Sequence, residues 1–298
     1  MKLHFWVFSY NRGIFLQNCV ESISACVPNA TVSVFDDNST DPETQQILQT
    51  IAQSHAIVQP DVTGKQCKHG GLYDNMQAAL LGSQSDDYIV FLQDDTQLVR
   101  PLQTEDFETI KNYFADKRNG FLQPAFLRAI NKSRDGSRTR FDAEKNVFYV
   151  DRFNRSAGAY YSDIIITQPE RLQSVDWRFL TRESANETQA RKHFGQMGYM
   201  ANPIAAWLPN VPAFRGKTQT WALKRAHQLS QCDFYPFEIM DNTQASALKS
   251  RPAGSIAYAE DVLCLKNNNA KLTKPWHYYP LQGRKILKKI HQLETYFR

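Results

Sequence analysis

The stretch that decides the fold is YIVFLQDDTQLV, Tyr88 to Val99, an apolar run that ends on two adjacent carboxylates. A run this apolar is typical of a strand covered on both faces, as in an α/β sheet. The carboxyl ends of such strands are where ligands usually bind. Asp94 and Asp95 repel each other, which a cation at the site would explain. A solvated turn with an Asx cap explains the pair equally well, so this stretch alone leaves both interpretations open.

The first hundred residues alternate between strand and helix patterns. Apolar stretches predict strands at 3–10, 30–40, 55–60 and 88–95, and helical spacing predicts helices at 13–27, 41–54 and 70–84. Asp41 and Pro42 are typical of an N-cap followed by the first turn of a helix. Strands and helices that alternate in this way predict a parallel sheet built from right-handed crossovers.

The pattern loosens after residue 100. Residues 101–280 mix short predicted strands and helices with more Pro, Arg and aromatic residues, as expected of a region shaped around a substrate. The last stretch, GRKILKKIHQLETYFR, predicts an amphipathic basic helix within 281–298. Its apolar stripe consists of Ile286, Leu287, Ile290, Leu293 and Phe297.

The bulk composition excludes several classes of protein. The chain has 298 residues, a net charge of +5 and a pI near 8.8, with no basic stripe interleaved with aromatics, so we expect no nucleic-acid partner. Five cysteines without a CxxC pair make a disulfide scaffold or zinc site improbable and favour a reducing compartment. The first apolar run is too short for a signal peptide, and no run reaches membrane-spanning length. We therefore expect a cytoplasmic protein.

Polar clusters follow three of the predicted strands. They are SYNR at 9–12, DDNSTD at 36–41 and QDDT at 93–96. In a parallel sheet these strand ends lie on one edge, so the three clusters can converge on one ligand. No glycine-rich GxGxxG or GxxxxGK[ST] loop follows the first strand, which argues against a dinucleotide fold or a P-loop. A phosphate-bearing ligand would then need a metal, for which Asp95 can supply carboxylate oxygens to Mg²⁺ or Mn²⁺.

Three blocks carry a resemblance to a known family. FSYNRGIFLQNCVESISA, VSVFDDNSTDPET and VTGKQCKHGGLYDNMQAALLGSQSDDYIVFLQDDTQLVRP resemble, in order and spacing, the nucleotide-sugar half of family 2 glycosyltransferases of GT-A fold. The resemblance implies an α/β fold, a Rossmann-like and mostly parallel sheet flanked by helices, with a mixed acceptor-binding half. It implies that residues 1–100 bind the nucleotide sugar, that 101–280 bind the acceptor and carry catalysis, and that 281–298 form the basic C-terminal helix.

The resemblance also assigns donor-binding roles. It implies that Tyr10 stacks on uracil, that Asp37 accepts from the ring N–H, and that Lys68 contacts the base or the phosphates. Asp94 matches the residue that faces the ribose, and Asp95 the metal-binding carboxylate of a DxD-type motif. The first position of that motif is Gln93 instead of Asp, and Gln93 can still hydrogen-bond a ribose hydroxyl. For Asn11 and Arg12 we favour a role in capping the loop.

Inverting transfer needs a carboxylate base beside the anomeric carbon. Glu260 and Asp261 resemble the family's ED motif, whereas Glu183 lies at the more usual distance after Asp95. Each could instead be a helix N-terminal carboxylate stabilised by the dipole. His277 resembles a metal ligand drawn from a C-terminal loop, and imidazole would favour Mn²⁺ over Mg²⁺, but a histidine among aromatics is often simply packed.

The predicted function is metal-dependent transfer of a hexose from a UDP-sugar to a glycan or lipid-linked hydroxyl, for example in bacterial surface polysaccharide or lipopolysaccharide synthesis. The basic helix would then contact the inner face of the membrane, unless it merely caps the domain. A haloacid-dehalogenase-type phosphatase is an alternative suggested by FDDNST, although Asn38 stands where its general acid is needed. A sugar-nucleotide pyrophosphorylase is another, although SYNRG lacks its glycine-rich loop. A carbohydrate-binding module would leave the acidic strand ends unexplained.

Overall fold

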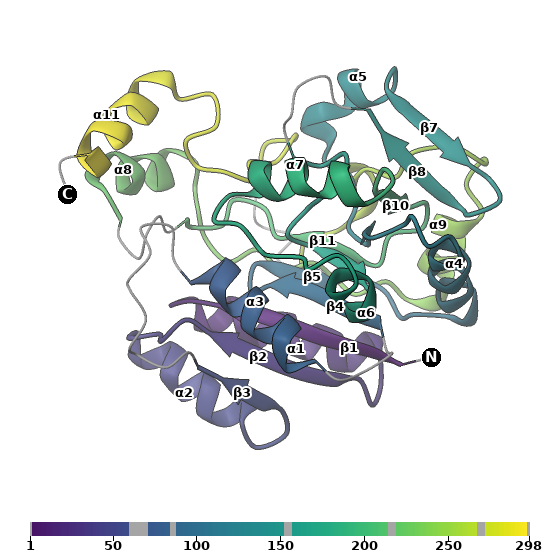
Figure 1. The fold of residues 1–298 in the computed structure, drawn as a ribbon. Helices are drawn as coiled ribbons and strands as arrows, with labels where there is room; N and C mark the ends of the chain where they lie inside the picture. Colours follow the sequence, from purple (N-terminus) through teal and green to yellow (C-terminus); the bar gives the residue numbers. More distant parts are fainter. Residues whose placement is uncertain are drawn as a thin grey trace.

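A nine-stranded sheet with helices on both faces organises the computed structural model of the chain (Figure 1). The structure describes residues 2–59, 71–83, 88–151, 157–213, 219–266 and 272–296. The strand order is β3-β2-β1-β4-β9-β6-β10-β8-β7, and the four strands from β3 to β4 run parallel. The predicted α/β class is confirmed.

The parallel half of the sheet is built from the first hundred residues, as predicted. Its strands and helices are β1 (Leu3–Ser9), α1 (Gly13–Cys26), β2 (Thr31–Asp36), α2 (Pro42–Ile51), β3 (Ala56–Val58), α3 (Leu72–Gly82) and β4 (Tyr88–Gln93). The predicted cap of α2 is present, because the Asp41 side chain accepts a hydrogen bond of 2.9 Å from the Thr44 amide.

Both faces of this half are buried, which explains the unbroken apolar runs of its central strands. Along β1, Phe5 and Val7 point into a core shared with Leu16 of α1. The intervening Trp6 and Phe8 point into a second core, which α3 covers. Because side chains alternate across a strand, a strand covered on both sides must be apolar at every position.

The second half extends the sheet with mixed pairing. Strand β9 lies between β4 and β6 and runs antiparallel to both. The elements of this half, as far as β11, are β5 (Thr96–Leu98), α4 (Thr104–Ala115), β6 (Leu122–Gln123), η1 (Ala129–Asn131), α5 (Lys132–Asp135), β7 (Thr139–Asp142), β8 (Val147–Val150), β9 (Ile165–Thr167), α6 (Pro169–Gln173), α7 (Glu183–His193), β10 (Gly198–Met200) and β11 (Ala205–Trp207). Strand β11 pairs with β5 in a separate two-stranded sheet. Strand β5 begins directly after the carboxylate pair Asp94–Asp95.

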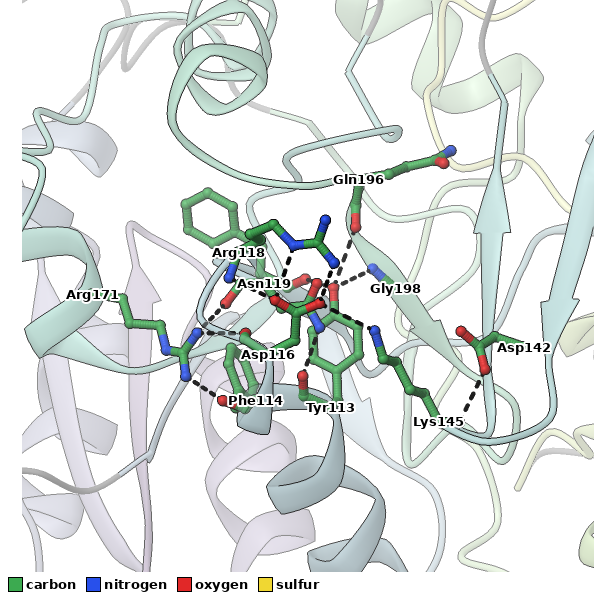
Figure 2. A network of polar contacts seen from close by, with 11 residues as sticks. Tyr113, Phe114, Asp116, Arg118, Asn119, Asp142, Lys145, Arg171, Gln196 and Gly198 are labelled. Atoms are coloured by element: carbon green, nitrogen blue, oxygen red, sulfur yellow. Dashed lines mark hydrogen bonds and ion pairs between the residues drawn. The ribbon is translucent and has the colours of Figure 1, made fainter.

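A polar network joins the C-terminal end of α4 to this second half (Figure 2). The buried Tyr113 hydroxyl donates to the Phe121 carbonyl at 2.9 Å and accepts from the Gly198 amide at 2.8 Å. Arg171 donates to the carbonyl oxygens of Asp116 at 2.7 Å and Asn119 at 3.1 Å. Arg171 also donates to the Phe114 carbonyl, and the Asn119 side chain donates to the Tyr113 carbonyl, so two carbonyls of the last turn of α4 are satisfied.

Helices α8 (Trp221–Leu229) and α11 (Lys285–Tyr296) pack as a pair at one end of the molecule (Figure 1). The other helices of the C-terminal region are α9 (Asn242–Lys249), which lies beside α4, and the short α10 (Ala259–Val262). Glu294 of α11 accepts from the first amides of α8, and the buried His291 ring bonds Thr220 at 2.7 Å. None of the helices in the described parts of the chain is long and apolar enough to cross a bilayer.

The predicted apolar stripe of the last helix divides between two environments. Leu287 packs against α8 and Ile290 is partly buried, but Ile286 is 76% exposed and Leu293 is 58% exposed. Phe297 lies outside the described residues. Of the four described residues of the stripe, two therefore pack toward the domain and two face outward.

Arg100 is a fully buried charge that joins α4 to the loop after β10. Its guanidinium forms two hydrogen bonds of 2.7 Å with Asp106, and it also donates to the carbonyls of Asn202 and Pro203. We expect Arg100→Met to lower the free energy of unfolding by about 3–5 kcal/mol, because it leaves Asp106 buried without its partner. Urea unfolding measures this change. Arg118→Met, which breaks an ion pair in which the arginine is 83% exposed, is the control and should leave the free energy of unfolding almost unchanged. Equal losses in the two variants would contradict the interpretation.

Candidate active site

A guanidinium lies between the two carboxylates that follow β4. Arg12, just after β1, forms an ion pair with Oδ1 of Asp94 and a hydrogen bond of 3.0 Å with Oδ2 of Asp95. Asp94 is fully buried and also accepts from the Ser9 hydroxyl at 3.2 Å and the Tyr10 amide at 3.3 Å. Because β1 and β4 are adjacent parallel strands, their ends meet here. Arg12 thus does more than cap its loop: it offsets the repulsion between the two carboxylates.

Burial dominates the ionisation of Asp94. It raises the pKa of this carboxyl to about 6, which the Arg12 guanidinium opposes and the neighbouring Asp95 reinforces. Asp94 therefore depends on Arg12 to remain charged at neutral pH. The same two carboxylates raise the pKa of Arg12 against the effect of its own burial.

Asp95 has one carboxylate oxygen that the rest of the described chain leaves unused. Its Oδ1 is buried without a hydrogen-bond partner, while Oδ2 contacts Arg12. A buried carboxylate oxygen without a donor is costly, and a divalent cation would satisfy it. Within the described ranges no cluster of three or more His, Cys, Asp or Glu side chains is arranged to hold a metal. A metal here would therefore combine Asp95 with oxygens of a ligand and water, as Mg²⁺ commonly does.

The end of β2 lies beside this site. The amide of Gly71 donates to Asp37 Oδ2 at 2.8 Å, and a Cβ on Gly71 would overlap the Asp37 carboxylate. Glycine is thus required at the start of α3 to let the backbone approach. Asn11, whose φ is 49°, joins the loops after β1 and β2 by accepting from the amides of Thr40 and Asp41. The predicted convergence of the strand ends is therefore present.

A cavity of about 530 Å³ opens at these strand ends. Gln93 and Asp95 line it from the first half of the chain. The second half contributes the carboxylates of Asp163 and Glu183, together with a wall made of Arg128, Tyr199, Trp207 and Tyr278. The cavity thus combines a carboxylate that can hold a cation with further acids, a cation and aromatic faces.

The three predicted base candidates lie in different surroundings. Glu183 begins α7, is exposed, and lines the cavity. Glu260 is 2% exposed, and its carboxylate accepts from the amides of Ala129 at 2.8 Å and Trp276 at 3.3 Å. Asp261 pairs with Lys132 at 2.8 Å and lines a separate cavity of about 290 Å³. Only Glu183 of the three is brought together with Asp95.

The remaining predicted residues are placed as follows. Tyr10 is partly buried, and burial together with Asp37 raises the pKa of its hydroxyl. The His277 carbonyl accepts from the Asn210 amide, and the His277 amide donates to the Asn210 side-chain Oδ1. His277 does not line the cavity, although its neighbour Tyr278 does. Lys68 lies outside the described residues.

Two charged residues of the cavity were not predicted as site residues. Asp163 Oδ2 accepts a hydrogen bond of 3.1 Å from the Tyr73 hydroxyl, while its Oδ1 is buried without a partner. Burial raises the pKa of Asp163 to about 6. Arg128 is the second, stacked between two aromatic rings. The small residues of RSAGAYYSD, which permit close approach of a ligand, are a signal that could have found Asp163, whereas no sequence pattern marks Arg128.

Comparison with protein families decides the identity of this fold and site. The sequence profile of glycosyl transferase family 2 matches residues 6–176, more than half of the chain. The chain belongs to glycosyl transferase family 2. The match spans the whole parallel half and continues through β9. Family membership confirms the resemblance of the three sequence blocks and excludes the phosphatase, the pyrophosphorylase and the binding module.

Solved structures with the same architecture are GT-A glycosyltransferases, so the fold is GT-A, as predicted. Residues 1–349 of S. aureus TarS superpose with a TM-score of 0.50 at 15% identity, covering 70% of this chain and 60% of that one. Longer S. aureus TarS gives 0.51 at 14% identity, covering 84% of this chain and 42% of that one. A Pyrobaculum calidifontis mannosyltransferase in complex with GDP-Man and Mn²⁺ gives 0.48 at 14%, covering 85% and 65%. The chain thus spans about half the length of TarS. None of the curated proteins compared with the chain matches it.

Asp163 makes folding stability depend on pH. Its folded pKa of about 6 lies above the unfolded value of roughly 3.9, so unfolding releases a proton between these pH values. The contribution of this group to stability is therefore greatest below pH 4, and it falls by about 2–3 kcal/mol as the pH rises to 6. We expect Asp163→Asn to become more stable relative to the wild type over that range, measured by urea unfolding at each pH. A difference between the two proteins that stays constant from pH 4 to 7 would contradict the raised pKa.

Proposed function

We propose that this glycosyltransferase uses a UDP-sugar, depends on a divalent metal, and transfers a hexose with inversion to a hydroxyl of a glycan or lipid-linked acceptor. The observation that carries the proposal is the unpartnered, buried Oδ1 of Asp95 at the shared end of β1 and β4, on a residue that lines a cavity with further carboxylates. A diphosphate and its cation suit this place, because parallel strand ends bind ligands and the carboxylate supplies a metal ligand.

The donor would lie along the three strand ends. Tyr10 would stack on the uracil ring and Asp37 would accept from its N–H, with Lys68, which precedes α3 in the sequence, as a further contact. Asp94 already has Ser9, Tyr10 and Arg12 as hydrogen-bond and ion-pair partners. Its proposed role beside the ribose is therefore indirect, by holding Arg12 in position. Gln93 is partly exposed and lines the cavity, which leaves it available to hydrogen-bond a ribose hydroxyl.

The metal would be held by Asp95, with His277 as a proposed further ligand. When bound, Mn²⁺ or Mg²⁺ supplies Lewis-acid stabilisation of the charge that develops on the diphosphate. Arg12 holds the Asp95 carboxylate through Oδ2, and no donor of the described residues reaches its Oδ1. The chain's own part is thus a preorganised carboxylate that needs no rearrangement when charge develops on the donor.

Glu183 is the base we propose, because its carboxylate lines the cavity, whereas the carboxylate of Glu260 is used by backbone amides and Asp261 lines a separate cavity. It would take the proton of the acceptor hydroxyl as that oxygen attacks the anomeric carbon. Asp163 is a second candidate on a specific observation: its Oδ1 is unpartnered and its pKa of about 6 suits a base near neutral pH.

Calorimetry with UDP tests the donor site. We expect UDP binding that requires Mn²⁺ or Mg²⁺ and that weakens at least tenfold in Asp95→Asn, since the cation loses the carboxylate proposed to hold it. Asp142→Asn, in the β7 hairpin away from the cavity, is the matched control and should bind like the wild type. Binding of UDP that is indifferent to both the metal and Asp95 would sink the proposed metal site, and no binding under any condition would sink the UDP-sugar donor.

The rates and pH profiles of two variants distinguish the base candidates Glu183 and Asp163. We expect Glu183→Gln to lower kcat by about 10²- to 10⁴-fold with UDP affinity unchanged, because a general base acts on the chemical step alone. Product release with a panel of UDP-sugars and acceptors measures the rate. If Asp163 is the base instead, Asp163→Asn has the large loss, and the acid limb that the wild type shows near pH 6 disappears. Full activity in both variants would exclude both residues.

The outward half of α11 supports contact with the inner face of an anionic membrane, where a lipid-linked or lipopolysaccharide acceptor would be met. Ile286, Leu293 and, at the start of α8, Trp221 are all more than half exposed. Lys285, Lys288 and Lys289 on the same helix are exposed as well. Exposed apolar side chains flanked by lysines are typical of a helix lying in a membrane interface.

Vesicle sedimentation tests this contact. We expect the wild type to sediment with vesicles containing an anionic lipid, and Ile286→Ser/Leu293→Ser to sediment several-fold less, because it removes apolar area without changing charge. Leu81→Ser, which removes an exposed leucine of α3, is the control. Equal sedimentation of wild type and double variant would contradict membrane contact while leaving the transferase proposal intact.

A further inference from the structure

Arg128 has a fixed position in the wall of the cavity. Its guanidinium carbon lies 4.0 Å from the centroid of the Trp207 ring and 4.4 Å from that of Tyr278, so the planar group is in contact with two aromatic faces. Trp207 is itself fixed by pairing with Thr96, the residue after Asp95. Such stacking orients the guanidinium plane and leaves the N–H groups at its edge.

The N–H groups of this guanidinium have no acceptor among the described residues. No hydrogen bond or ion pair joins the Arg128 side chain to any part of the chain that the structure describes, although Arg12, Arg100 and Arg171 all use theirs. Burial lowers the pKa of Arg128, and the carboxylates of Asp95 and Glu183 act on it only through space. A partly buried arginine without an acceptor is costly, and the cost is relieved if a ligand supplies an anion.

We infer that Arg128 is an anion-binding residue of this cavity, which takes a phosphate or carboxylate group of the substrate in a bidentate contact. A stacked guanidinium presents two parallel N–H donors, which match the spacing of oxygens in both groups. The inference rests on the proposed function, since it assumes that the cavity is the transfer site. Two sources can supply the anion: the diphosphate of the donor, or a charged group carried by the acceptor.

Two calorimetric arms distinguish these sources. In the first, UDP and uridine are titrated into the protein with Mn²⁺. If the anion is the donor's diphosphate, Arg128→Gln weakens UDP at least tenfold and leaves uridine unchanged. In the second, glycerol 3-phosphate and glycerol are titrated into protein saturated with UDP and Mn²⁺. If the anion belongs to the acceptor, only glycerol 3-phosphate binds, and Arg128→Gln abolishes that binding while UDP affinity is unchanged.

Two further variants guard against a structural explanation. Arg128→Lys keeps the charge but loses the planar fork. If charge and the bidentate contact both contribute to binding, it should lose some affinity, but less than Arg128→Gln. Arg140→Gln removes an exposed arginine that also stacks on a ring, 4.5 Å from the Tyr149 centroid, and should change neither arm.

The outcomes separate this inference from the transferase proposal. If neither UDP nor glycerol 3-phosphate binding changes in Arg128→Gln, the inference is overturned even when UDP binds. If UDP does not bind the wild type at all, the proposed donor is wrong, and the second arm is run on the protein alone. Glycerol 3-phosphate binding that is lost in Arg128→Gln would then still support the anion site, and unchanged or absent binding would overturn it.

Discussion

The contact on which the site depends is the pair of bonds from Arg12 to Asp94 and Asp95. It joins the ends of two adjacent parallel strands, β1 and β4, through residues more than eighty positions apart. Asp94 is fully buried, so without Arg12 this carboxylate would be both desolvated and next to a second negative charge. The contact therefore lets the chain place a second carboxylate, Asp95, at the cavity with one oxygen unused.

The rest of the fold serves to hold this strand edge and to build a wall opposite it. Apolar side chains on both faces of β1 and β4 bury the strands up to the residues where the polar cluster begins. Strand β9 then joins the edge of β4 in the opposite direction, and the segment before β9 carries Asp163 into the cavity. Strand β11 pairs with the residues after Asp95, which brings Trp207 and the stacked Arg128 to the same place.

Sequence patterns predicted the features that depend on local periodicity. The four parallel strands, their helices and the convergence of Tyr10, Asp37 and Asp95 follow from apolar runs and polar strand ends, because topology fixes where such ends meet. The hydrogen-bond partners of the site side chains could not be predicted from these patterns. Glu260 resembles a catalytic carboxylate in sequence, yet its oxygens accept from amides at positions 129 and 276, contacts that only the tertiary fold creates. Asp163 and Arg128 were missed for the same reason, since burial and stacking define them.

A crystal structure of the chain with UDP and Mn²⁺, with the ion located by its anomalous signal, tests the central claim most directly. We expect the ion against Oδ1 of Asp95, and the uracil ring between Tyr10 and Asp37 at the ends of β1 and β2. An ion or nucleotide bound elsewhere, for example in the separate cavity lined by Asp261 and Cys264, would contradict the account.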